Sequence, residues 1–374
     1  MDYRKKLFSL KNIYDMEYSD PVFLDAIKES IDFHRVSCPD YDKILTNKGF
    51  KTGYLKSVAD LHLIPPIPTM FYKSYELFSV PENKMLIKST TSGTKGIPTT
   101  VGLDMKTCVY GARMIWKTIA YHKLFSAIPT NYIVLGYQPN RHNKMGAVKT
   151  AFGSTFLAPP LRREYALKSN GAAYDLNIEG IKTSLFAYSK AAFPVRFVGF
   201  PAYLYFMMTM LKENNIRLSL HPKSKILLGG GWKQFHSDQV SKLEMYQMAE
   251  ETLGINEQNI KEFFAVVESN VLFCDCINHH FHVPVYGRVI IRDVKTLEPV
   301  PNGMPGILNL ISPITGSMPL GSILTDDLAI MYDGKNCGCG IQSPYFEILG
   351  RVGIQEIKTC AAGASELLKK GGKL

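Results

Sequence analysis

The sequence predicts an α/β fold in which a large N-terminal lobe of mixed sheets and flanking helices precedes a smaller β-rich subdomain. The chain has 374 residues, which is too long for one small core. Its composition, 46% hydrophobic and 20% charged, is typical of a globular protein. Strand and helix patterns alternate through the first part of the chain, whereas the last part has strand patterns alone. We therefore expect an α/β core over residues 1–282, a β-rich subdomain over 283–350 and a short tail over 351–374.

The first predicted elements are a helix and two short strands. Residues 19–34 are predicted to be helical, because Asp20 is a favourable N-cap, Pro21 fits the first turn and apolar residues repeat at helical spacing. Residues 85–90 and 98–103 are predicted strands, with a loop that contains two glycines between them.

A long helix is predicted after Asp104, which can act as its N-cap. The predicted apolar face of this helix consists of Met105, Cys108, Ala112, Ile115 and Ile119. A predicted strand over residues 131–137 follows. Another, over 195–200, leads directly into a predicted helix over 201–215.

The strand predicted over residues 224–232 ends in three glycines. The next helix is predicted from Ser237 to about Leu253, where Gly254 stops it. The β-rich part has strand patterns separated by Gly, Pro and Asn turns. These patterns cover residues 285–294, 306–311, 322–333 and 345–351.

The net charge of +10 suits nucleic acid, an anionic small molecule or an acidic protein partner. The basic residues form short clusters and not one long arm, which disfavours nucleic acid and favours a phosphorylated ligand or an acidic protein surface. The longest apolar run, residues 202–211, is shorter than the roughly 20 residues that span a bilayer, and the N-terminus lacks a signal-peptide core. We expect a cytoplasmic protein with no membrane span.

The stretch KSTTSGTKGIPTT combines hydroxyl residues, two glycines and a lysine. It is not a Walker loop, which needs a glycine followed by Lys-Ser or Lys-Thr, and it is not the dinucleotide fingerprint, which opens a helix after a strand. Gly93 and Gly96 allow positive φ, so that successive amides can face an anion. Ser92 and Thr94 add hydroxyl donors, and Lys95 adds a positive charge. An ordinary polar hairpin loop is the alternative.

Part of that stretch, TTSGTKGIP, resembles the phosphate loop of the adenylate-forming superfamily, T-S-G-T-T-G-x-P-K. This resemblance implies an ATP-binding loop. Its residues would be Thr91, Ser92, Gly93, Thr94 and Gly96. The usual lysine is replaced by Thr99, and Lys95 stands where threonine is usual. Either the catalytic lysine has moved to Lys95, or the contacts to pyrophosphate are weaker in this chain.

Two further segments resemble adenine-side motifs of the same superfamily. KILLGGGW is similar to the strand and glycine turn beside adenine, which implies nucleotide contacts by Gly230, Gly231 and Trp232. FFAVVE is similar to Y-G-x-T-E, which places Phe264 beside adenine and Glu268 on Mg²⁺. The alternatives are that the two aromatic residues belong to the core and that Glu268 forms a surface ion pair.

Two segments near the C-terminus resemble the ribose-side motifs. ILTDD is similar to Y-R-T-G-D, which places Asp327 on the ribose hydroxyls, with Asp326 in place of the usual glycine. GRVG is similar to the hinge motif G-R-x-D, which places Arg351 near the ribose and phosphate, with Gly353 in place of the hinge aspartate. A turn carboxylate and a structural salt bridge are the respective alternatives for Asp327 and Arg351.

Over nearly its whole length the sequence resembles the acyl-protein synthetase family of bacterial bioluminescence (LuxE type), the fatty-acid-activating subunit of the fatty acid reductase complex. The segments that carry this likeness are residues 66–74, 198–207, 229–233, 267–284, 296–306 and 324–330. The resemblance implies that ATP and Mg²⁺ convert a fatty acid to acyl-AMP, and that the acyl group then moves to Cys360 and on to a partner acyl reductase. The chain ends soon after Arg351, so we expect the superfamily's C-terminal lobe to be absent.

Cys360 has small neighbours that leave it room to move, and Lys358, Lys369 and Lys370 could lower its pKa. An inert cysteine in the tail is the alternative. Two other functions also fit the sequence: an acyl- or aryl-CoA ligase that uses a separate thiol acceptor, and a non-catalytic scaffold that binds nucleotide and zinc.

Seven cysteines in a chain without a secretion signal favour metal binding or reactive thiols over disulfides. Two Cys-x-Cys pairs occur, with three histidines just after the first. Phenylacetate–CoA ligases have a similar cysteine, histidine and later C-x-C-G. This likeness implies a structural Zn²⁺ site of Cys276, His282, Cys337 and Cys339, with Cys274 as an alternative ligand. Free buried thiols are the alternative.

Overall fold

The structure, a computed structural model, describes residues 2–90, 100–141, 143, 145–171, 173–232, 235 and 238–351. The chain divides into two compact units. The first unit contains the described residues of Met1–Ser89, Ile97–Thr118 and Ala265–Leu374, and the second unit contains those of Thr90–Gly96 and Ile119–Phe264. The expected domain boundaries at residues 282 and 350 stay predictions.

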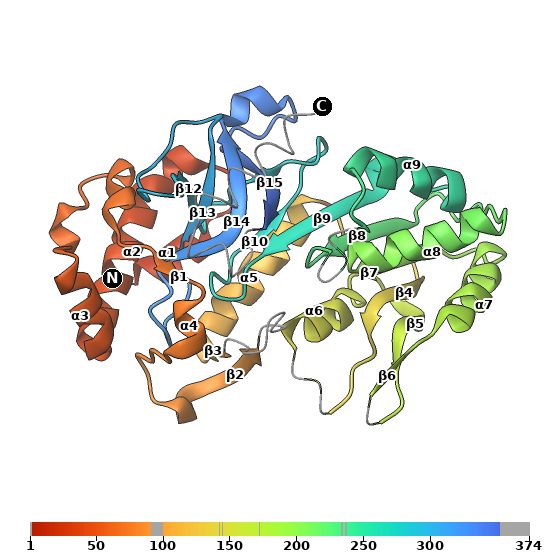
Figure 1. Cartoon of the computed structure of the whole chain (residues 1–374), viewed down its shortest axis with the longest axis horizontal. Helices are drawn as coiled ribbons and strands as arrows, with labels where there is room; N and C mark the ends of the chain where they lie inside the picture. The colour runs from red at the N-terminus through yellow and green to blue at the C-terminus, as the bar shows by residue number, and fades with distance from the viewer. Residues whose placement is uncertain are drawn as a thin grey trace. The chain divides into compact units, whose positions relative to one another are not determined.

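The main sheet of the first unit has the strand order β11-β15-β14-β13-β12, and β1 pairs with β14 in parallel. All other pairs in this sheet are antiparallel, and Figure 1 shows β13, β14 and β15 beside one another. The strands are β1 (Ile67–Pro68), β11 (Phe281–His282), β12 (Arg288–Arg292), β13 (Pro305–Ile311), β14 (Ser322–Tyr332) and β15 (Tyr345–Arg351). The strands predicted after residue 283 are confirmed.

The remaining elements of the first unit come mostly from the N-terminal part of the chain. The helices are α1 (Tyr3–Ser9), α2 (Met16–Ser37), α3 (Pro39–Asn47), α4 (Phe71–Ser74) and α5 (Met105–Tyr121), the last of which extends to the start of the second unit. The 3-10 turns are η1 (Thr52–Tyr54), η2 (Val58–Leu63), η3 (Glu82–Lys84) and η6 (Gly334–Cys337). The short strands are β2 (Met85–Thr90), β3 (Thr100–Asp104) and β10 (Leu272–Cys274), and β2 pairs with β3.

Helix α2 is present, but its predicted N-cap is wrong. The helix begins one turn earlier, where the Asp15 side chain accepts a hydrogen bond from the Tyr18 amide, and Pro21 lies inside it. The Asp20 carboxylate instead accepts a hydrogen bond from the buried Arg288 guanidinium at 2.5 Å. Because that ion pair connects α2 to β12, it uses the carboxylate that the sequence pattern assigned to the cap.

Helix α5 begins after Asp104, whose carboxylate accepts from the Thr107 amide at 2.7 Å, so this cap prediction is confirmed. The predicted apolar face is wrong for Met105 and Ile115, which are 60% and 48% exposed, and confirmed for Ile119, which is buried. Among the described residues of the helix, the buried ones are Thr107, Tyr110, Met114, Thr118 and Ile119. Tyr110 stacks on Phe8, and the Thr107 hydroxyl accepts from the Gly316 amide, contacts that sequence periodicity cannot reveal.

The second unit is built on a sheet with the strand order β9-β8-β7-β4-β5-β6. All neighbouring pairs are parallel except β5 and β6. The strands are β4 (Thr130–Tyr137), β5 (Pro160–Ser169), β6 (Tyr174–Leu176), β7 (Val195–Gly199), β8 (Lys225–Gly229) and β9 (Ile260–Ala265). The central strands are almost fully buried, as expected for parallel strands that are covered on both faces.

Helices α7, α8 and α9 cover one face of this sheet, and their apolar side chains form its core with alternate residues of the strands (Figure 1). The helices of this unit are α6 (Gly146–Ser154), α7 (Ile178–Ser189), α8 (Pro201–Glu213) and α9 (Lys242–Leu253), with the 3-10 turn η5 (Glu257–Asn259). The start predicted for α9 is wrong, because Ser241 caps the helix. Its predicted stop at Gly254 is confirmed by a left-handed C-cap at φ 67°.

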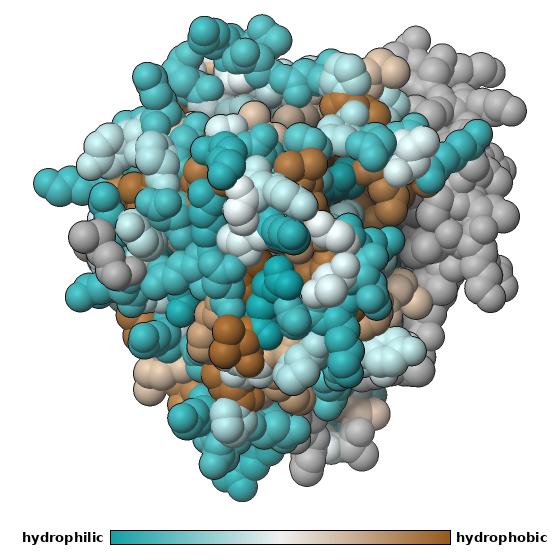
Figure 2. Space-filling view, turned by 90° about the vertical axis from the view of Figure 1, so that its left-hand side faces the viewer, coloured by the Kyte–Doolittle hydropathy of each residue, from teal (hydrophilic) through white to brown (hydrophobic). Residues whose placement is uncertain are grey.

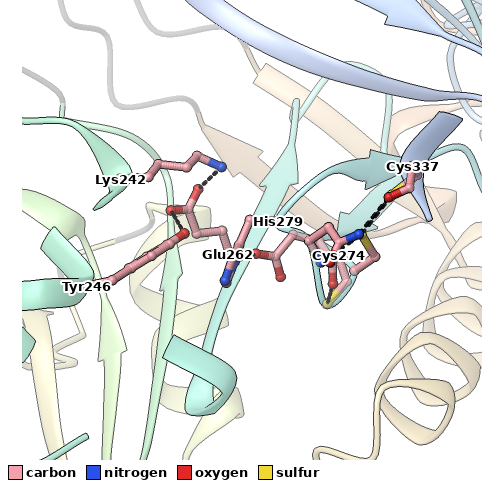
Figure 3. Close-up of polar contacts among 9 residues, drawn as sticks. Lys242, Tyr246, Glu262, Cys274, His279 and Cys337 are labelled. Carbon is pink, nitrogen blue, oxygen red and sulfur yellow. Dashed lines mark hydrogen bonds and ion pairs between the residues drawn. The ribbon is translucent and has the colours of Figure 1, made fainter. Parts of the chain in front are cut away.

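Two polar contacts connect α9 to β9. The Glu262 carboxylate accepts from the Lys242 ammonium at 3.0 Å and from the Tyr246 hydroxyl at 3.2 Å (Figure 3). Both donors lie on the helix, so β9 is fixed by side chains as well as by its hydrogen bonds to β8.

The surface seen from the side of α2 and α3 is mostly hydrophilic, with separate hydrophobic patches (Figure 2). Exposed apolar residues on α2, such as Val36 at 87%, are of the isolated kind that is common on protein surfaces. Within the described part of the chain, every helix is too short or too polar to cross a membrane.

Candidate functional site

The predicted phosphate loop and the predicted acyl acceptor lie outside the described residues. These positions are Thr91, Ser92, Gly93, Thr94, Lys95, Gly96, Thr99 and Cys360, together with Gly353, Lys358, Lys369 and Lys370. The roles that the resemblance gives them stay predictions. The two strands on either side of the loop, β2 and β3, are described and pair with each other.

The structure brings the two predicted ribose-side residues together. Asp327 on β14 lies directly opposite Arg351 on β15, and the Arg351 Nε atom is 3.6 Å from the Asp327 carboxylate. Asp327 is only 8% exposed, whereas the Arg351 side chain is 48% exposed. The pair therefore presents one buried carboxylate and one accessible guanidinium, which suit hydroxyl and phosphate oxygens respectively.

A β-bulge sets this pairing. Ala329 pairs with Ile348, but Leu328 pairs with Gly350, so Leu349 is an extra residue on β15. Without that extra residue in the register, Asp327 would lie opposite Gly350. Bulges often re-aim a side chain beside an active site, and this one places Arg351 opposite Asp327.

The segment after β1 fixes β14 close to this pair. The Thr69 hydroxyl donates to the Asp326 carboxylate at 3.2 Å, and the Thr69 amide donates to the Leu324 carbonyl at 2.9 Å. Asp326 replaces the glycine that is usual in the superfamily motif. Here it has a structural partner, so it holds β14 in place next to Asp327.

Glu268 is buried in the first unit, 4% exposed, in a turn that follows β9. The Ser269 and Asn270 amides both donate to the Val266 carbonyl, and Asn270 takes a left-handed conformation at φ 56°. A surface ion pair, the alternative considered for Glu268, does not fit this degree of burial. A buried carboxylate oxygen is a suitable ligand for Mg²⁺.

The predicted adenine-side residues lie in the second unit. Gly230 and Gly231 follow β8 with φ values of 83° and 66°, a turn that favours glycine at both positions. Trp232 is 7% exposed and packs on Tyr205 with 5.6 Å between ring centroids, so it is part of the core of this unit. Phe264 on β9 is half-buried.

A cluster of three cysteines and one histidine forms the second candidate site. Cys276, His282, Cys337 and Cys339, the four residues predicted for zinc, each bring one ligand atom to within 4.8 Å of all the others. The Cys276 and Cys337 sulfurs are 3.5 Å apart, and the Cys339 sulfur is 3.2 Å from His282 Nε2. A tetrahedron with Zn–S bonds of about 2.3 Å has S–S edges of about 3.8 Å, and the 3.5 Å between the Cys276 and Cys337 sulfurs is within a few tenths of an ångström of that length.

Hydrogen bonds with backbone groups orient these ligand side chains. His282 Nδ1 lies 2.7 Å from the Ser343 carbonyl and must donate to it, so Nε2 presents its lone pair to the cluster. The Asn278 amide donates to the Cys276 sulfur and the Ile341 amide donates to the Cys339 sulfur. Gly338 between the paired cysteines has φ 74°, which allows the tight turn that points both thiols inward.

The alternative ligand Cys274 lies outside the set of converging atoms. Its sulfur is 3.7 Å from the Asp275 carbonyl, and Nδ1 of the neighbouring His279 is hydrogen-bonded to the buried Asp275 carboxylate at 2.6 Å. Figure 3 shows Cys274, His279 and Cys337 with their polar contacts. Burial and the neighbouring thiols raise the pKa of Cys337 to about 12, which favours the protonated thiol. A bound cation would reverse this preference, because coordinating thiols are deprotonated.

Sequence reasoning gave no role to several residues that support these sites. Thr69 and Ser343 act through contacts distant in sequence, which no local pattern indicates. His280 lies 3.2 Å from the Cys337 sulfur through Nδ1, and Asn278 donates to the Cys337 carbonyl at 2.6 Å. For Asn278 and His280, the position between the predicted ligands Cys276 and His282 was the available sequence signal.

Comparison with protein families gives one match that covers nearly the whole chain. Residues 11–369 match the family model described as acyl-protein synthetase, LuxE. Two similar curated proteins are both named long-chain-fatty-acid–luciferin-component ligase. The protein of Aliivibrio fischeri is 25% identical over 318 residues, 83% of this chain and 80% of that protein, and the protein of Vibrio harveyi is 22% identical over 360 residues, 91% and 86%.

Solved structures support the fold. 2-Hydroxyisobutyryl-CoA ligase in the postadenylation state with 2-HIB-AMP has a TM-score of 0.65 and 16% identity, and the match covers 91% of this chain and 70% of that one. An open conformation of the same ligase with 2-HIB-AMP and CoA has a TM-score of 0.63 and 17% identity, with 89% and 74% covered. The predicted α/β fold of an adenylate-forming enzyme is confirmed.

Proposed function

Because this chain belongs to the LuxE family of acyl-protein synthetases, we propose that it activates a fatty acid with ATP and carries the acyl group as a thioester on Cys360. In the first step a carboxylate oxygen attacks the α-phosphorus of ATP, and pyrophosphate leaves. In the second step the Cys360 thiolate attacks the acyl carbon of the mixed anhydride, and AMP leaves. The family match over residues 11–369 is the observation that carries the proposal.

The ribose-side pair gives the first step its positioning. Asp327 would accept hydrogen bonds from the ribose hydroxyls, and the accessible guanidinium of Arg351 would donate to ribose or α-phosphate oxygens. Because both are held by the same strand pair, they bind the nucleotide in one orientation relative to the incoming carboxylate. Such positioning supplies much of the rate of a two-substrate reaction.

The other predicted nucleotide residues would act on the phosphates and on adenine. Glu268 would hold Mg²⁺, which neutralises phosphate charge when it is bound. Lys95 would supply the positive charge that the phosphate loop lacks at Thr99. On the adenine side, Gly230 and Gly231 would allow close approach of the backbone, and Phe264 would pack on the ring.

ATP–pyrophosphate exchange tests the adenylation step. We expect exchange that depends on Mg²⁺ and on a fatty acid, with equal rates in the wild type and in Cys360→Ala, because the thiol acts only in the second step. Asp327→Ala should raise the KM for ATP at least tenfold. No exchange with any acid from C4 to C16 would contradict the proposal and would favour the alternative function, a non-catalytic scaffold that binds nucleotide and zinc.

The acceptor and the destination of the acyl group are further parts of the proposal. The relatives' names specify ligation of a long-chain fatty acid to a luciferin component, which agrees with a protein acceptor and later use of the acyl group. Delivery to an acyl reductase partner and the cytoplasmic location stay predictions from the sequence. Formation of acyl-CoA on addition of CoA, with no acyl-protein, would favour the alternative acyl-CoA ligase.

We also propose that Cys276, His282, Cys337 and Cys339 bind a structural Zn²⁺ ion. Four protein ligands leave no open position, so the ion would hold the chain segments together and take no part in catalysis. The purified protein should contain about one zinc per chain by mass spectrometry of the metal. Cys337→Ser should lose it and Cys274→Ser should keep it. Zinc-free protein with all thiols titratable by a disulfide reagent would contradict the site.

A further inference from the structure

The metal cluster and the ribose-side pair occupy the two ends of one β-hairpin. Asp327 and Arg351 are paired at one end of β14 and β15, and Tyr332 and Tyr345 are paired at the other. Residues 333–344 connect the strands beyond Tyr332 and contain both Cys337 and Cys339. The whole arrangement lies in the first unit (Figure 1).

The cluster anchors the connecting segment of this hairpin to separate parts of the chain. Cys337 approaches Cys276, which follows β10, and Cys339 approaches His282 on β11. The same β11 pairs with β15, through His282 opposite Tyr345. A long connection between strands is ordinarily the mobile end of a hairpin, but here its two cysteines meet one ligand from each of two other segments.

Aromatic stacking continues from the cluster into the strands. His280, which contacts the Cys337 sulfur, stacks on Tyr345 at 4.4 Å and 15° between the ring planes. Tyr345 in turn stacks on Tyr332 at 5.2 Å and 25°. These three rings join the cluster to both strands at the first pair of the hairpin register.

From that point a series of paired residues leads to the nucleotide residues. The pairs proceed from Tyr332–Tyr345 to Ala329–Ile348, cross the bulge at Leu349 and end at Asp327–Arg351. A one-residue change of register on either side of the bulge would remove Arg351 from Asp327. The hairpin therefore has one geometry that forms the pair, and the cluster holds its connecting segment in that geometry.

We propose that the zinc-bound cluster positions Asp327 and Arg351 for the nucleotide through the β14–β15 hairpin, so that zinc and ATP each strengthen binding of the other. This inference rests on the proposed function for the nucleotide and on the proposed zinc site. Linkage requires the two effects to be equal, and coupling free energies in proteins typically correspond to factors of about 5 to 150. Cys276, Cys337, Cys339 and His282 are positioning residues in this scheme and do not touch substrate.

The direct test measures zinc affinity of the full-length protein by competition with a chromophoric chelator, with and without Mg²⁺ and α,β-methylene-ATP. We expect the nucleotide to tighten zinc binding at least fivefold. Asp327→Ala should bind zinc as tightly as the wild type but show no effect of nucleotide, since it keeps the cluster and lacks the ribose contact. If zinc and nucleotide both bind the wild type and zinc affinity changes less than twofold, the coupling is contradicted.

The reciprocal measurement uses calorimetry of α,β-methylene-ATP with Cys337→Ser, with Cys274→Ser as the matched control for loss of a buried thiol. The coupling is supported if Cys337→Ser binds the nucleotide more weakly by the factor found for zinc and Cys274→Ser binds it as tightly as the wild type. Hydrogen exchange should then increase in β14 and β15 and not in the second-unit strand β4. If Cys337→Ser does not fold, chelator-treated wild type replaces it.

The possible failures are distinguishable. Protein that binds nucleotide but no zinc contradicts the metal site, and protein that binds zinc but no nucleotide contradicts the proposed function. Either result also overturns the coupling. Binding of both ligands without mutual effect overturns the coupling alone.

Discussion

At the scale of single residues, His34 shows how burial fixes a protonation state. Its ring is 1% exposed, and its Nδ1 and Nε2 atoms are 2.7 Å from the Ser79 hydroxyl and 3.1 Å from the Thr315 carbonyl. The carbonyl can only accept, so Nε2 carries the proton and Nδ1 accepts from Ser79. Burial lowers the pKa of His34 to about 4, because a charged ring would lose its solvation.

This lowered pKa predicts acid sensitivity. The folded protein keeps His34 neutral, while the unfolded chain takes up a proton below its ordinary pKa of about 6.5, so stability is lost as the pH falls from about 6.5 toward 4. The loss amounts to about 3 kcal/mol by pH 4. Urea unfolding at pH 7 and pH 4 should show this difference between wild type and His34→Gln. Equal pH dependence of the two proteins would contradict the assignment.

The residues of the candidate sites were predictable to different degrees. The four ligands of the cluster were predicted from the resemblance to phenylacetate–CoA ligases, and the structure brings those four together. Ser343 and Thr69 were not, because each acts through a contact with a residue far away in sequence. The roles predicted for the nucleotide residues stay predictions.

At the scale of elements, existence and order were predictable, and faces and ends were less so. The strands over residues 131–137 and 306–311 follow directly from apolar runs between turn residues. Helix α5 is apolar on two faces, so periodicity could not show which one is buried. The stacking of Tyr110 on Phe8 decides it. The start of α2 was misplaced because Asp20 binds Arg288, a partner on a distant strand.

The β14–β15 hairpin is the element in which a small irregularity has the largest functional consequence. The strand pattern of residues 345–351 predicts a regular strand, but the bulge at Leu349 shifts its register by one residue. Nothing in the local sequence specifies a bulge there. It becomes understandable only in the pair, where it sets Arg351 opposite Asp327, and this is the geometry through which the cluster is proposed to act.

At the scale of the whole molecule, the predicted nucleotide residues are divided between two units. Glu268, Asp327 and Arg351 belong to the first unit, and Gly230 and Gly231 to the second. The sequence could indicate the fold because the motifs of the adenylate-forming superfamily occur in their usual order along the chain. The structural neighbours confirm this fold. It could not indicate the units, because the first one is assembled from three separate segments.

The central claim is that the acyl group moves from AMP to Cys360, and intact-mass spectrometry tests it most directly. The wild type and the matched control Cys108→Ala, incubated with ATP, Mg²⁺ and a fatty acid, should each gain one acyl mass that neutral hydroxylamine removes. Cys360→Ala should gain none while it still catalyses pyrophosphate exchange. Equal acylation of Cys360→Ala would contradict the account.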